Sequence, residues 1–395
     1  MSDAVYVQGT GMTRFDRTPN RRVPDLGAEA VFSALDDAGL SIADIQAVYC
    51  GNIMEAGQTP GQRIMQQVGQ TGAPVVNVTN ACATGATALR EAWAAIRAGL
   101  HDVCLAVGVE KMGAGLLGWG EPETIHTEGL LGSDLMPALF AHAGSVHSAR
   151  YGTSFEQFAR VAVKNHQHAV HNPLARYRKE TPLEEVMNAE MIAYPLTKLM
   201  CSVNVDGAAA AVLVSARKAR ELGMSRSVRI RASALTSDPY SERNLTMPDF
   251  DTCTTNAANQ AYEMAGVGPR DLDLIELHDC FATAELMHYE NLGLCPRGEA
   301  GRLIDDGDTW AGGRIPVNLS GGLLSKGHPI GATGIANIHE LTLHLRGEAG
   351  ARQQAGARLG LAHVIGPVSF THLTLPTSDL VKISGGAAPL KKKKK

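Results

Sequence analysis

The sequence predicts an α/β protein made of two similar halves. Short apolar runs that suit buried strands alternate with stretches of helical periodicity, which is typical of parallel α/β layers. The same order of elements occurs twice along 395 residues, a length that accommodates two domains or one large duplicated domain. Glycine is abundant, with 42 residues, and aromatic residues make up only 5%, which favours close packing of helices on sheets.

The first half contains most of the regular pattern. Its predicted elements are, in order, a strand over 4–10, a helix over 25–38 that Gly39 ends, a strand over 45–50, an apolar run from Val75, a helix from about Ala86, a strand over 103–109, a strand over 206–214 and a helix over 216–222. Residues 116–195 interrupt the alternation with scattered proline, histidine and methionine, and have a helical stretch over 155–171. We interpret this interruption as an excursion that covers the site.

The second half repeats this order. Its predicted elements are a strand over 228–234, a helix over 256–265, a strand over 272–278, the short run 316–319, a glycine-rich turn and a helix from about Thr333. The segment 85–89 (Gly-Ala-Thr-Ala-Leu) returns as 331–335 (Gly-Ala-Thr-Gly-Ile), and the same offset places Cys82 on His328. If the two equivalent helices point their N-termini inward across a pseudo-twofold axis, this thiol and this imidazole meet.

These patterns predict four segments. They are residues 1–115, continued by 196–225, as the first half; 116–195 as a loop or lid domain; 226–366 as the second half; and 367–395 as a tail.

Cys82 lies where a small-residue turn opens a helix. Unpaired backbone N–H groups and the helix dipole at such a position favour an anion, so they should shift the thiol, with an ordinary pKa of about 8.5, toward thiolate. The plain alternative is a small, buried hydrophobic residue.

Two further stretches place polar groups where the periodicity expects apolar ones. His278, Asp279 and Cys280 follow a predicted strand, at the edge where α/β sheets usually hold ligands, although a buried histidine bonded to a carbonyl would also fit His278. Residues 321–334 hold five glycines around His328, which indicates a backbone that closely approaches something rather than a flexible loop.

Composition excludes several other functions. The net charge of −4 and scattered basic residues argue against nucleic-acid binding. Seven irregularly spaced cysteines without a Cys-x-x-Cys motif argue against a disulfide framework and a zinc site, and His166, His168 and His171 lack a further ligand at metal spacing. Lys111 and Arg314 are either solvated or steer an anionic substrate. Without a signal-peptide profile or a membrane span, we expect a soluble, intracellular protein.

Three motifs together resemble the thiolase superfamily. They are Asn80-Ala-Cys-Ala-Thr-Gly85, His278-Asp-Cys-Phe281 and Ser325-Lys-Gly-His-Pro-Ile-Gly-Ala-Thr-Gly334, in this order. Within that superfamily the chain resembles sterol carrier protein 2-type thiolases, in which His-Asp-Cys-Phe replaces Asn-Glu-Ala-Phe. The likeness runs from about residue 4 to Gly366.

The resemblance implies a duplicated five-layer α/β/α/β/α fold with an inserted loop domain, usually dimeric, and we expect a homodimer or homotetramer. It implies that Cys82 attacks a 3-ketoacyl-CoA and keeps the acyl group while acetyl-CoA or propionyl-CoA departs. His328 would accept the Cys82 proton and hold the thioester oxygen with His278, and Cys280 would protonate the departing enolate. Coenzyme A would be a co-substrate, with no permanently bound cofactor and no metal.

The sequence departs from the family after Gly366. Thiolases continue with a glycine-rich turn, whose backbone N–H joins that of Cys82 in an oxyanion hole, and with a final small-residue strand. Here Val368 stands where a glycine belongs and the alternation is unclear, so we interpret 367–395, with its five terminal lysines, as aberrant or foreign sequence. We expect a bacterial cytoplasmic enzyme rather than a peroxisomal one, because no Ser-Lys-Leu-like ending is present.

Two alternatives to thiolytic cleavage in fatty-acid or sterol side-chain degradation stay open. One is a retro-aldol lyase acting on a 3-hydroxyacyl-CoA, which would need no nucleophile. The other is a non-catalytic, acyl-CoA-binding partner subunit.

Overall fold

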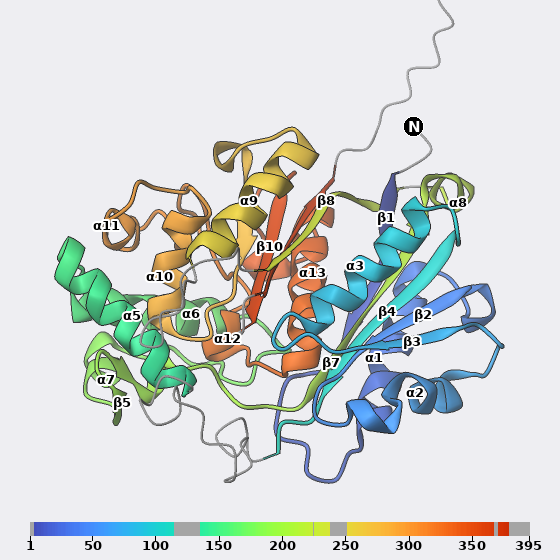
Figure 1. Ribbon diagram of the computed structural model, residues 1–395, viewed down its shortest axis with the longest axis horizontal. Coiled ribbons are helices and arrows are strands. Elements are labelled where there is room, and N and C mark those ends of the chain that lie inside the picture. Colours follow the sequence, from blue (N-terminus) through green and yellow to red (C-terminus); the bar gives the residue numbers. More distant parts are fainter. Residues whose placement is uncertain (1–3, 114–134, 224, 238–250, 367–369, 379–395) are drawn as a thin grey trace, which may run out of the picture.

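The computed structural model describes residues 4–113, 135–223, 225–237, 251–366 and 370–378. Within them, one large sheet carries the fold (Figure 1). Its strands are β1 (Val5–Met12), β2 (Ala47–Gly51), β3 (Val75–Val78), β4 (Val103–Glu110), β7 (Gly207–Ser215), β8 (Val228–Ser237), β9 (Leu274–Glu276), β10 (Gly360–Gly366) and β11 (Phe370–Thr377). A second, two-stranded sheet consists of β5 (Met191–Ala193) and β6 (Leu196–Thr197).

The helices of the described residues have the following bounds: α1 (Val23–Ala38), α2 (Pro60–Val68), α3 (Thr84–Arg97), α5 (Met136–Tyr151), α6 (Phe155–Ala169), α7 (Leu183–Met187), α8 (Ala216–Glu221), α9 (Asp251–Ala265), α10 (Ala282–Asn291), α11 (Ala300–Asp305), α12 (Gly322–Ser325) and α13 (Ile330–Arg346). None of these helices is long and apolar enough to cross a bilayer.

The strand order shows the predicted duplication directly. It reads β3-β2-β4-β7-β1-β8-β11-β10-β9, so that β1 matches β8, β7 matches β11, β4 matches β10 and β2 matches β9. Strand directions match as well, because β2 and β4 are parallel, as are β9 and β10, while β7 and β11 run antiparallel to their neighbours on both sides. An isolated parallel bridge from Ile275 to Val317 stands where β3 pairs with β2 in the first half.

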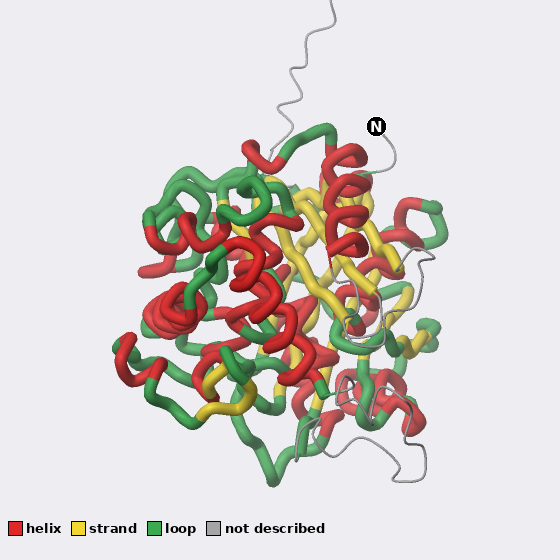
Figure 2. The backbone as a smooth tube through the Cα atoms, turned by 60° about the vertical axis from the view of Figure 1, so that its left-hand side comes forward, coloured by secondary structure: helices red, strands yellow, loops and turns green. Residues whose placement is uncertain are grey.

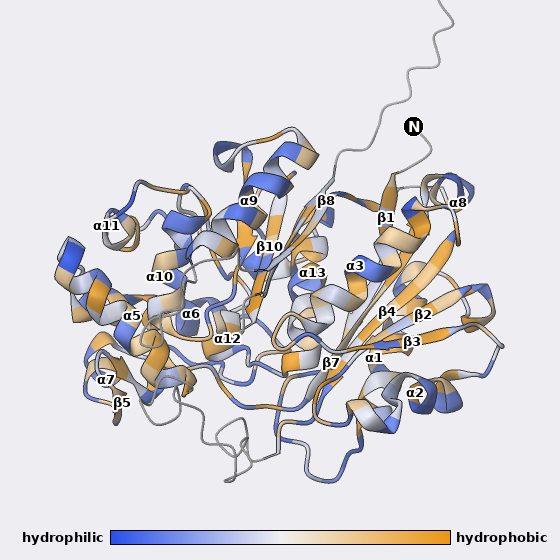
Figure 3. Ribbon diagram, viewed as in Figure 1, coloured by the Kyte–Doolittle hydropathy of each residue, from blue (hydrophilic) through white to orange (hydrophobic). Residues whose placement is uncertain are grey.

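The apolar faces of the strands and helices determine how the layers pack on one another. Strands β4 and β7 are buried along their whole length, as their near-continuous apolar sequences require (Figure 3). One core cluster joins α3 and α13 to strands of both halves, a second packs α1 and α2 on the outer face of the first half, and a third packs α9 and α10 on the second. Figure 2 shows the band of strands with helices to either side. The predicted five-layer α/β/α/β/α fold is therefore confirmed.

The inserted segment packs against the second half, although it interrupts the first. Helix α6 contacts α10 and α12, and a buried ion pair joins Lys164 of α6 to Glu285 of α10 at 2.5 Å. Beside it, Asn165 donates a hydrogen bond to Asp279 at 2.8 Å. This segment thereby reaches the residue next to His278. Residues 116–134, the beginning of the predicted lid, lie outside the described part of the chain.

The tail differs from the sequence-based expectation. We expected no clean strand after Gly366, but Phe370–Thr377 forms β11 between β8 and β10, the place that β7 holds between β1 and β4. Its side chains from Thr371 to Thr377 are all buried. The strand therefore has no solvent-exposed face, and its sequence shows no clean alternation between apolar and polar residues. The interpretation of 367–395 as foreign sequence stays a prediction, and Val368 and the terminal lysines lie outside the described residues.

The two halves meet where glycines bring backbones into contact. A Cβ atom on Gly108 of β4 would lie 2.1 Å from the carbonyl oxygen of Gly331 in α13, and one on Gly85 of α3 would lie 2.5 Å from the same oxygen. A Cβ on Gly334 would lie 2.4 Å from the backbone nitrogen of Ala86. Glycine is therefore required for the approach of α3 and α13, as the glycine-rich motif predicts.

We predict that Gly108→Ala lowers the free energy of unfolding by about 2 kcal/mol, because an added methyl group must displace backbone rather than a flexible side chain. The matched control is Gly57→Ala, since a Cβ there would meet no atom within 4 Å. Chemical denaturation of both variants measures the difference. Equal stability of the two variants would contradict a tight crossing of the halves.

Candidate active site

Cys82 lies in a constrained turn between β3 and α3. Ala81 adopts a left-handed conformation with φ 42°, which is uncommon for a residue with a side chain. Thr84 holds this turn, because its hydroxyl donates to the carbonyl of Ala81 at 2.6 Å and accepts from the backbone N–H of Asn80 at 2.7 Å. Cys82 therefore stands two residues before the first residue of α3.

His328 occupies the equivalent place in the second half, two residues before α13. Its backbone N–H donates to the carbonyl of Val203 at 2.9 Å, and its Nδ1 lies 2.8 Å from the hydroxyl oxygen of Thr333. That hydroxyl donates its own hydrogen to the carbonyl of Pro329 at 3.0 Å. Its oxygen is therefore the acceptor in the contact with His328, and Nδ1 of His328 carries the hydrogen. The Nε2 atom is thereby left as an unprotonated base, and the described residues offer it no hydrogen-bond partner.

His278 and Cys280 lie in the loop between β9 and α10. The predicted strand over 272–278 was too long, because β9 ends at Glu276. Asp279, between them, accepts backbone N–H bonds from Leu323 at 2.7 Å and Leu324 at 3.2 Å in α12. A Cβ on Gly322 would lie 2.1 Å from the carboxylate of Asp279, so the glycine-rich motif also makes room for this anchor. The loop that carries His278 is in this way fixed to the segment that leads to His328.

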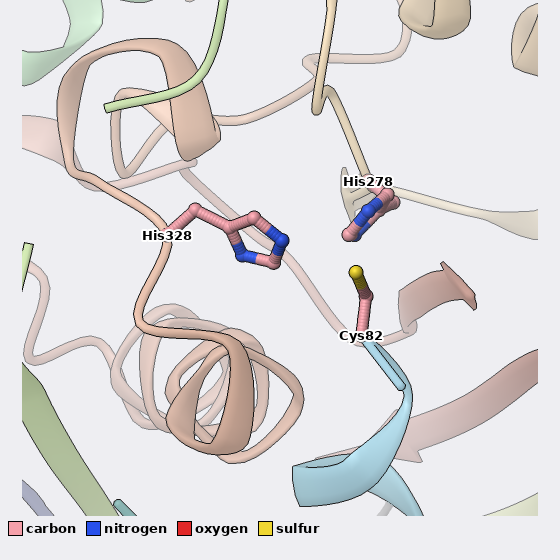
Figure 4. Close-up of side chains that lie close together, drawn as sticks. All are labelled: Cys82, His278 and His328. Atoms are coloured by element: carbon pink, nitrogen blue, oxygen red, sulfur yellow. The ribbon is translucent and has the colours of Figure 1, made fainter. Parts of the chain in front are cut away.

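Three of the four predicted site residues converge. Donor atoms of Cys82, His278 and His328 all lie within 4.8 Å of one another, and the two imidazole rings meet edge to face with centroids 5.0 Å apart. Figure 4 shows the sulfur and the two rings pointing toward one another from three separate segments, with Nε2 of His328 turned toward Cys82. The fourth residue, Cys280, is also buried, and after burial itself the largest cause of the raised pKa of its thiol is Cys82.

Burial keeps this site uncharged. It lowers the pKa of His328 to about 3, with a smaller contribution from Lys326, and it lowers the pKa of His278 well below its usual value. Burial also raises the pKa of the Cys82 thiol to about 12 and that of Cys280 well above its usual value. The resting site therefore holds two thiols and two neutral imidazoles.

This finding corrects the expectation that the helix N-terminus shifts Cys82 toward thiolate. The side chain is only 8% exposed, and the cost of placing a charge in that apolar surrounding exceeds the gain from nearby backbone N–H groups. At neutral pH the Cys82 sulfur is therefore a protonated thiol.

Glu110 is a positioning residue that sequence analysis missed. Its buried carboxylate ends β4 and accepts backbone N–H bonds from Ile53 at 3.0 Å, Met54 at 3.0 Å and Gly331 at 3.2 Å. Burial raises its pKa to about 7. It thereby connects the first half to the first turn of α13, next to His328. An acidic residue at the carboxyl end of an otherwise apolar strand was the available signal.

Further histidines surround His278. The backbone N–H of His278 donates to Nδ1 of His363 in β10 at 3.5 Å, and the rings of His363 and His288 lie with centroids 4.5 Å apart. Burial lowers the pKa of both. We did not single out either residue from the sequence, although His363 interrupts an apolar strand.

Lys111, Arg314 and His168, which we weighed from the sequence as binding residues, have ordinary partners. Lys111 donates to the carbonyls of Pro19 and Arg21, and Arg314 pairs with Asp308 at 3.3 Å. His168 accepts from the backbone of Ala311 at 2.9 Å and contacts the carbonyl of Asn318. The oxyanion-hole donor expected after Gly366 falls on 367–369, outside the described residues, but a Cβ on Gly366 would lie 3.7 Å from the backbone nitrogen of Cys82.

Comparison with known families agrees with this fold. The thiolase N-terminal domain matches residues 5–217, more than half of the chain, and a thiolase C-terminal domain-like family matches 237–376. The chain therefore belongs to the thiolase family. The match extends beyond Gly366, where we expected the likeness to end, because β11 supplies the final strand.

Individual relatives indicate which members of the thiolase family this chain resembles. The chain is 42% identical over 385 residues to sterol carrier protein 2 of Bos taurus, covering 93% of this chain and 70% of that protein. It is 40% identical over 381 residues to acetyl-CoA acetyltransferase of Methanothermobacter thermautotrophicus, covering 93% and 97%. The likeness to sterol carrier protein 2 that the motifs indicated is confirmed, and family membership supports acyltransferase activity.

Two solved structures resemble the fold. One is the Ltp2-ChsH2(DUF35) aldolase, with TM-score 0.82 and 26% identity, covering 96% of this chain and 99% of that one. The other is human mitochondrial 3-ketoacyl-CoA thiolase, with TM-score 0.74, covering 95% of this chain and 99% of that one. Its sequence identity of 17% supports a similarity of the fold only.

The raised pKa of Cys82 predicts how its alkylation depends on pH. With a pKa near 12, the thiolate fraction rises about tenfold for each pH unit, so the rate should increase about 100-fold between pH 7 and pH 9. Mass spectrometry of the Cys82 peptide after brief exposure to iodoacetamide measures this rate. A rate that levels off below pH 9 would instead indicate a preformed thiolate.

Proposed function

We propose that this protein cleaves 3-ketoacyl-CoA thiolytically through an acyl-Cys82 intermediate. The observation that carries the proposal is the convergence of the Cys82 sulfur with an unprotonated imidazole nitrogen of His328. The products are acetyl-CoA, or propionyl-CoA from a 2-methyl substrate, and a shortened acyl-CoA. Fatty-acid or sterol side-chain degradation is the setting that we propose, in line with the relatives.

The first half-reaction begins at Cys82. Its sulfur attacks the 3-keto carbon while Nε2 of His328 takes the thiol proton, so no free thiolate needs to form in the buried site. The Thr333 hydroxyl oxygen accepts a hydrogen bond from the Nδ1–H of His328, which holds the ring in the reactive tautomer and stabilises the imidazolium. The bond between the 2- and 3-carbons then breaks, and the acyl group stays on sulfur as a thioester.

The departing enolate needs stabilisation and a proton. In this proposal His278 and His328, whose rings meet with centroids 5.0 Å apart, hold the thioester oxygen as its charge develops, and such a donor contributes about 3–4 kcal/mol to catalysis. Cys280 stays protonated because burial raises its pKa, so it has a proton to donate to the enolate carbon. Coenzyme A then gives its thiol proton to the Cys280 thiolate and its sulfur takes the acyl group, while His328 returns its proton to the departing Cys82 sulfur, which completes a ping-pong cycle.

A retro-aldol lyase is the second candidate, and the likeness to an aldolase structure favours it. Such a reaction does not require a nucleophilic thiol. The positioning of Cys82 between two imidazoles therefore supports thiolysis over lyase chemistry.

We predict that acetoacetyl-CoA with coenzyme A loses its ultraviolet enolate absorbance in the presence of the enzyme. Cys82→Ala should abolish this loss, whereas Cys104→Ala, a buried thiol in a separate core cluster, should retain it. Mass spectrometry of the wild-type protein incubated with substrate alone should find an acyl group on Cys82. An active Cys82→Ala variant would overturn the proposal.

Thr333→Val should lower kcat at least about tenfold, because it removes the acceptor that fixes the tautomer of His328. The rate should fall more than KM rises, since the hydrogen bond strengthens as His328 becomes charged. Thr342→Val is the control: Thr342 is buried in the same helix, and the described residues offer its hydroxyl no partner. Equal activity of both variants would remove Thr333 from the mechanism.

A further inference from the structure

The residues that converge at Cys82 also form a set of metal donors. A thiol sulfur and two imidazole nitrogens lie within 4.8 Å of one another, and no other group of three or more such side chains in the described residues comes as close together. Zn²⁺ binds sulfur at about 2.3 Å and imidazole nitrogen at about 2.0–2.1 Å in a tetrahedron, so its donors stand roughly 3.3–3.8 Å apart. Side-chain rotations that move the donor atoms by about an ångström therefore suffice to bring all three within bonding distance of one ion.

Two buried nitrogens in this set have no partner. Nε2 of His328 and Nδ1 of His278 make no hydrogen bond within the described structure, although the residues are only 5% and 1% exposed. In His328 the other nitrogen is fixed by Thr333, the kind of outer contact that orients a histidine and leaves its second nitrogen free to bind a metal. Unsatisfied buried polar atoms are costly, so the unpaired Nε2 of His328, whose lone pair is free, favours a ligand that binds this lone pair.

The charges around the set suit a divalent cation bound with one thiolate. The carboxylate of Glu110 interacts electrostatically with Cys82. The positive charge of Lys326 disfavours a cation near His328, but Lys326 is itself paired with Glu276 at 3.4 Å. Three protein donors leave a fourth tetrahedral position for water, as in zinc sites that are not closed by protein.

We propose that Cys82, His278 and His328 bind one zinc ion reversibly and that the bound ion blocks the site. On binding, the sulfur–hydrogen bond of Cys82 breaks, its proton goes to the buffer, and the sulfur lone pair forms the bond to Zn²⁺, with no change of oxidation state. Binding itself does not depend on the proposed thiolysis. The inhibition does, since the ion occupies the sulfur that attacks the substrate and the nitrogen that takes its proton.

Cobalt tests the site, because tetrahedral Co²⁺ bound to thiolate absorbs light where Zn²⁺ does not. Titration of the reduced full chain with Co²⁺ should produce a sulfur-to-cobalt band that saturates at one equivalent and disappears when one equivalent of Zn²⁺ is added. The band should be absent in Cys82→Ala and present in Cys280→Ala, whose thiol is the nearby alternative. Circular dichroism of each variant checks that it is folded.

His328→Gln should weaken Co²⁺ binding at least tenfold without removing the band, because the sulfur ligand remains. No band in the wild-type protein, or a band that persists in Cys82→Ala, would overturn the proposed site.

An activity measurement tests whether bound zinc inhibits thiolysis, separately from whether zinc binds. Free Zn²⁺ at ten times its dissociation constant should lower thiolysis about tenfold, and a chelator should restore it. Full activity with the site saturated by Zn²⁺ would overturn the inhibition. Cobalt binding in a protein with no thiolysis at all would leave the metal site standing and contradict the proposed function instead.

Discussion

The crossing of α3 and α13 is the contact on which the site depends. Each helix is preceded, two residues before its first residue, by a side chain of the candidate site, Cys82 or His328. The backbones approach so closely at Gly85 and Gly331 that no side chain fits between them. Because duplication gives both halves the same strand–turn–helix unit, one contact about the pseudo-twofold axis brings together residues that are far apart in the sequence.

The second consequence of this crossing is burial. The central layer of helices lies between the two halves of the sheet, so the site forms in an environment that disfavours charge. Thiols stay protonated there and imidazoles stay neutral. The proposed thiolysis then requires proton transfer within the cluster, and the hydrogen bond from Nδ1 of His328 to Thr333 leaves Nε2 as the nitrogen that takes the proton. The same neutral sulfur and nitrogen atoms make the cluster attractive to a zinc ion.

Much of this could be predicted from the sequence, because periodicity and repetition are local properties. The repeat of 85–89 in 331–335 placed Cys82 opposite His328, and the glycines around His328 indicated a close backbone approach. Glu110, Asn165 and His363 escaped notice because their roles depend on partners far along the chain. The strand β11 was missed because it is buried on both faces, and the pKa of Cys82 because sequence reveals a helix end but not the depth of burial.

Isotope exchange tests acyl transfer through Cys82 most directly. The enzyme is mixed with an unlabelled acyl-CoA, such as acetyl-CoA, and labelled coenzyme A, with no ketoacyl substrate present. Transfer of the acyl group to the sulfur of Cys82 and back predicts that label enters the acyl-CoA pool, and that Cys82→Ala shows no exchange. A protein that cleaves ketoacyl-CoA but exchanges no label, or a Cys82→Ala variant that exchanges as fast as the wild type, would contradict a covalent intermediate on this residue.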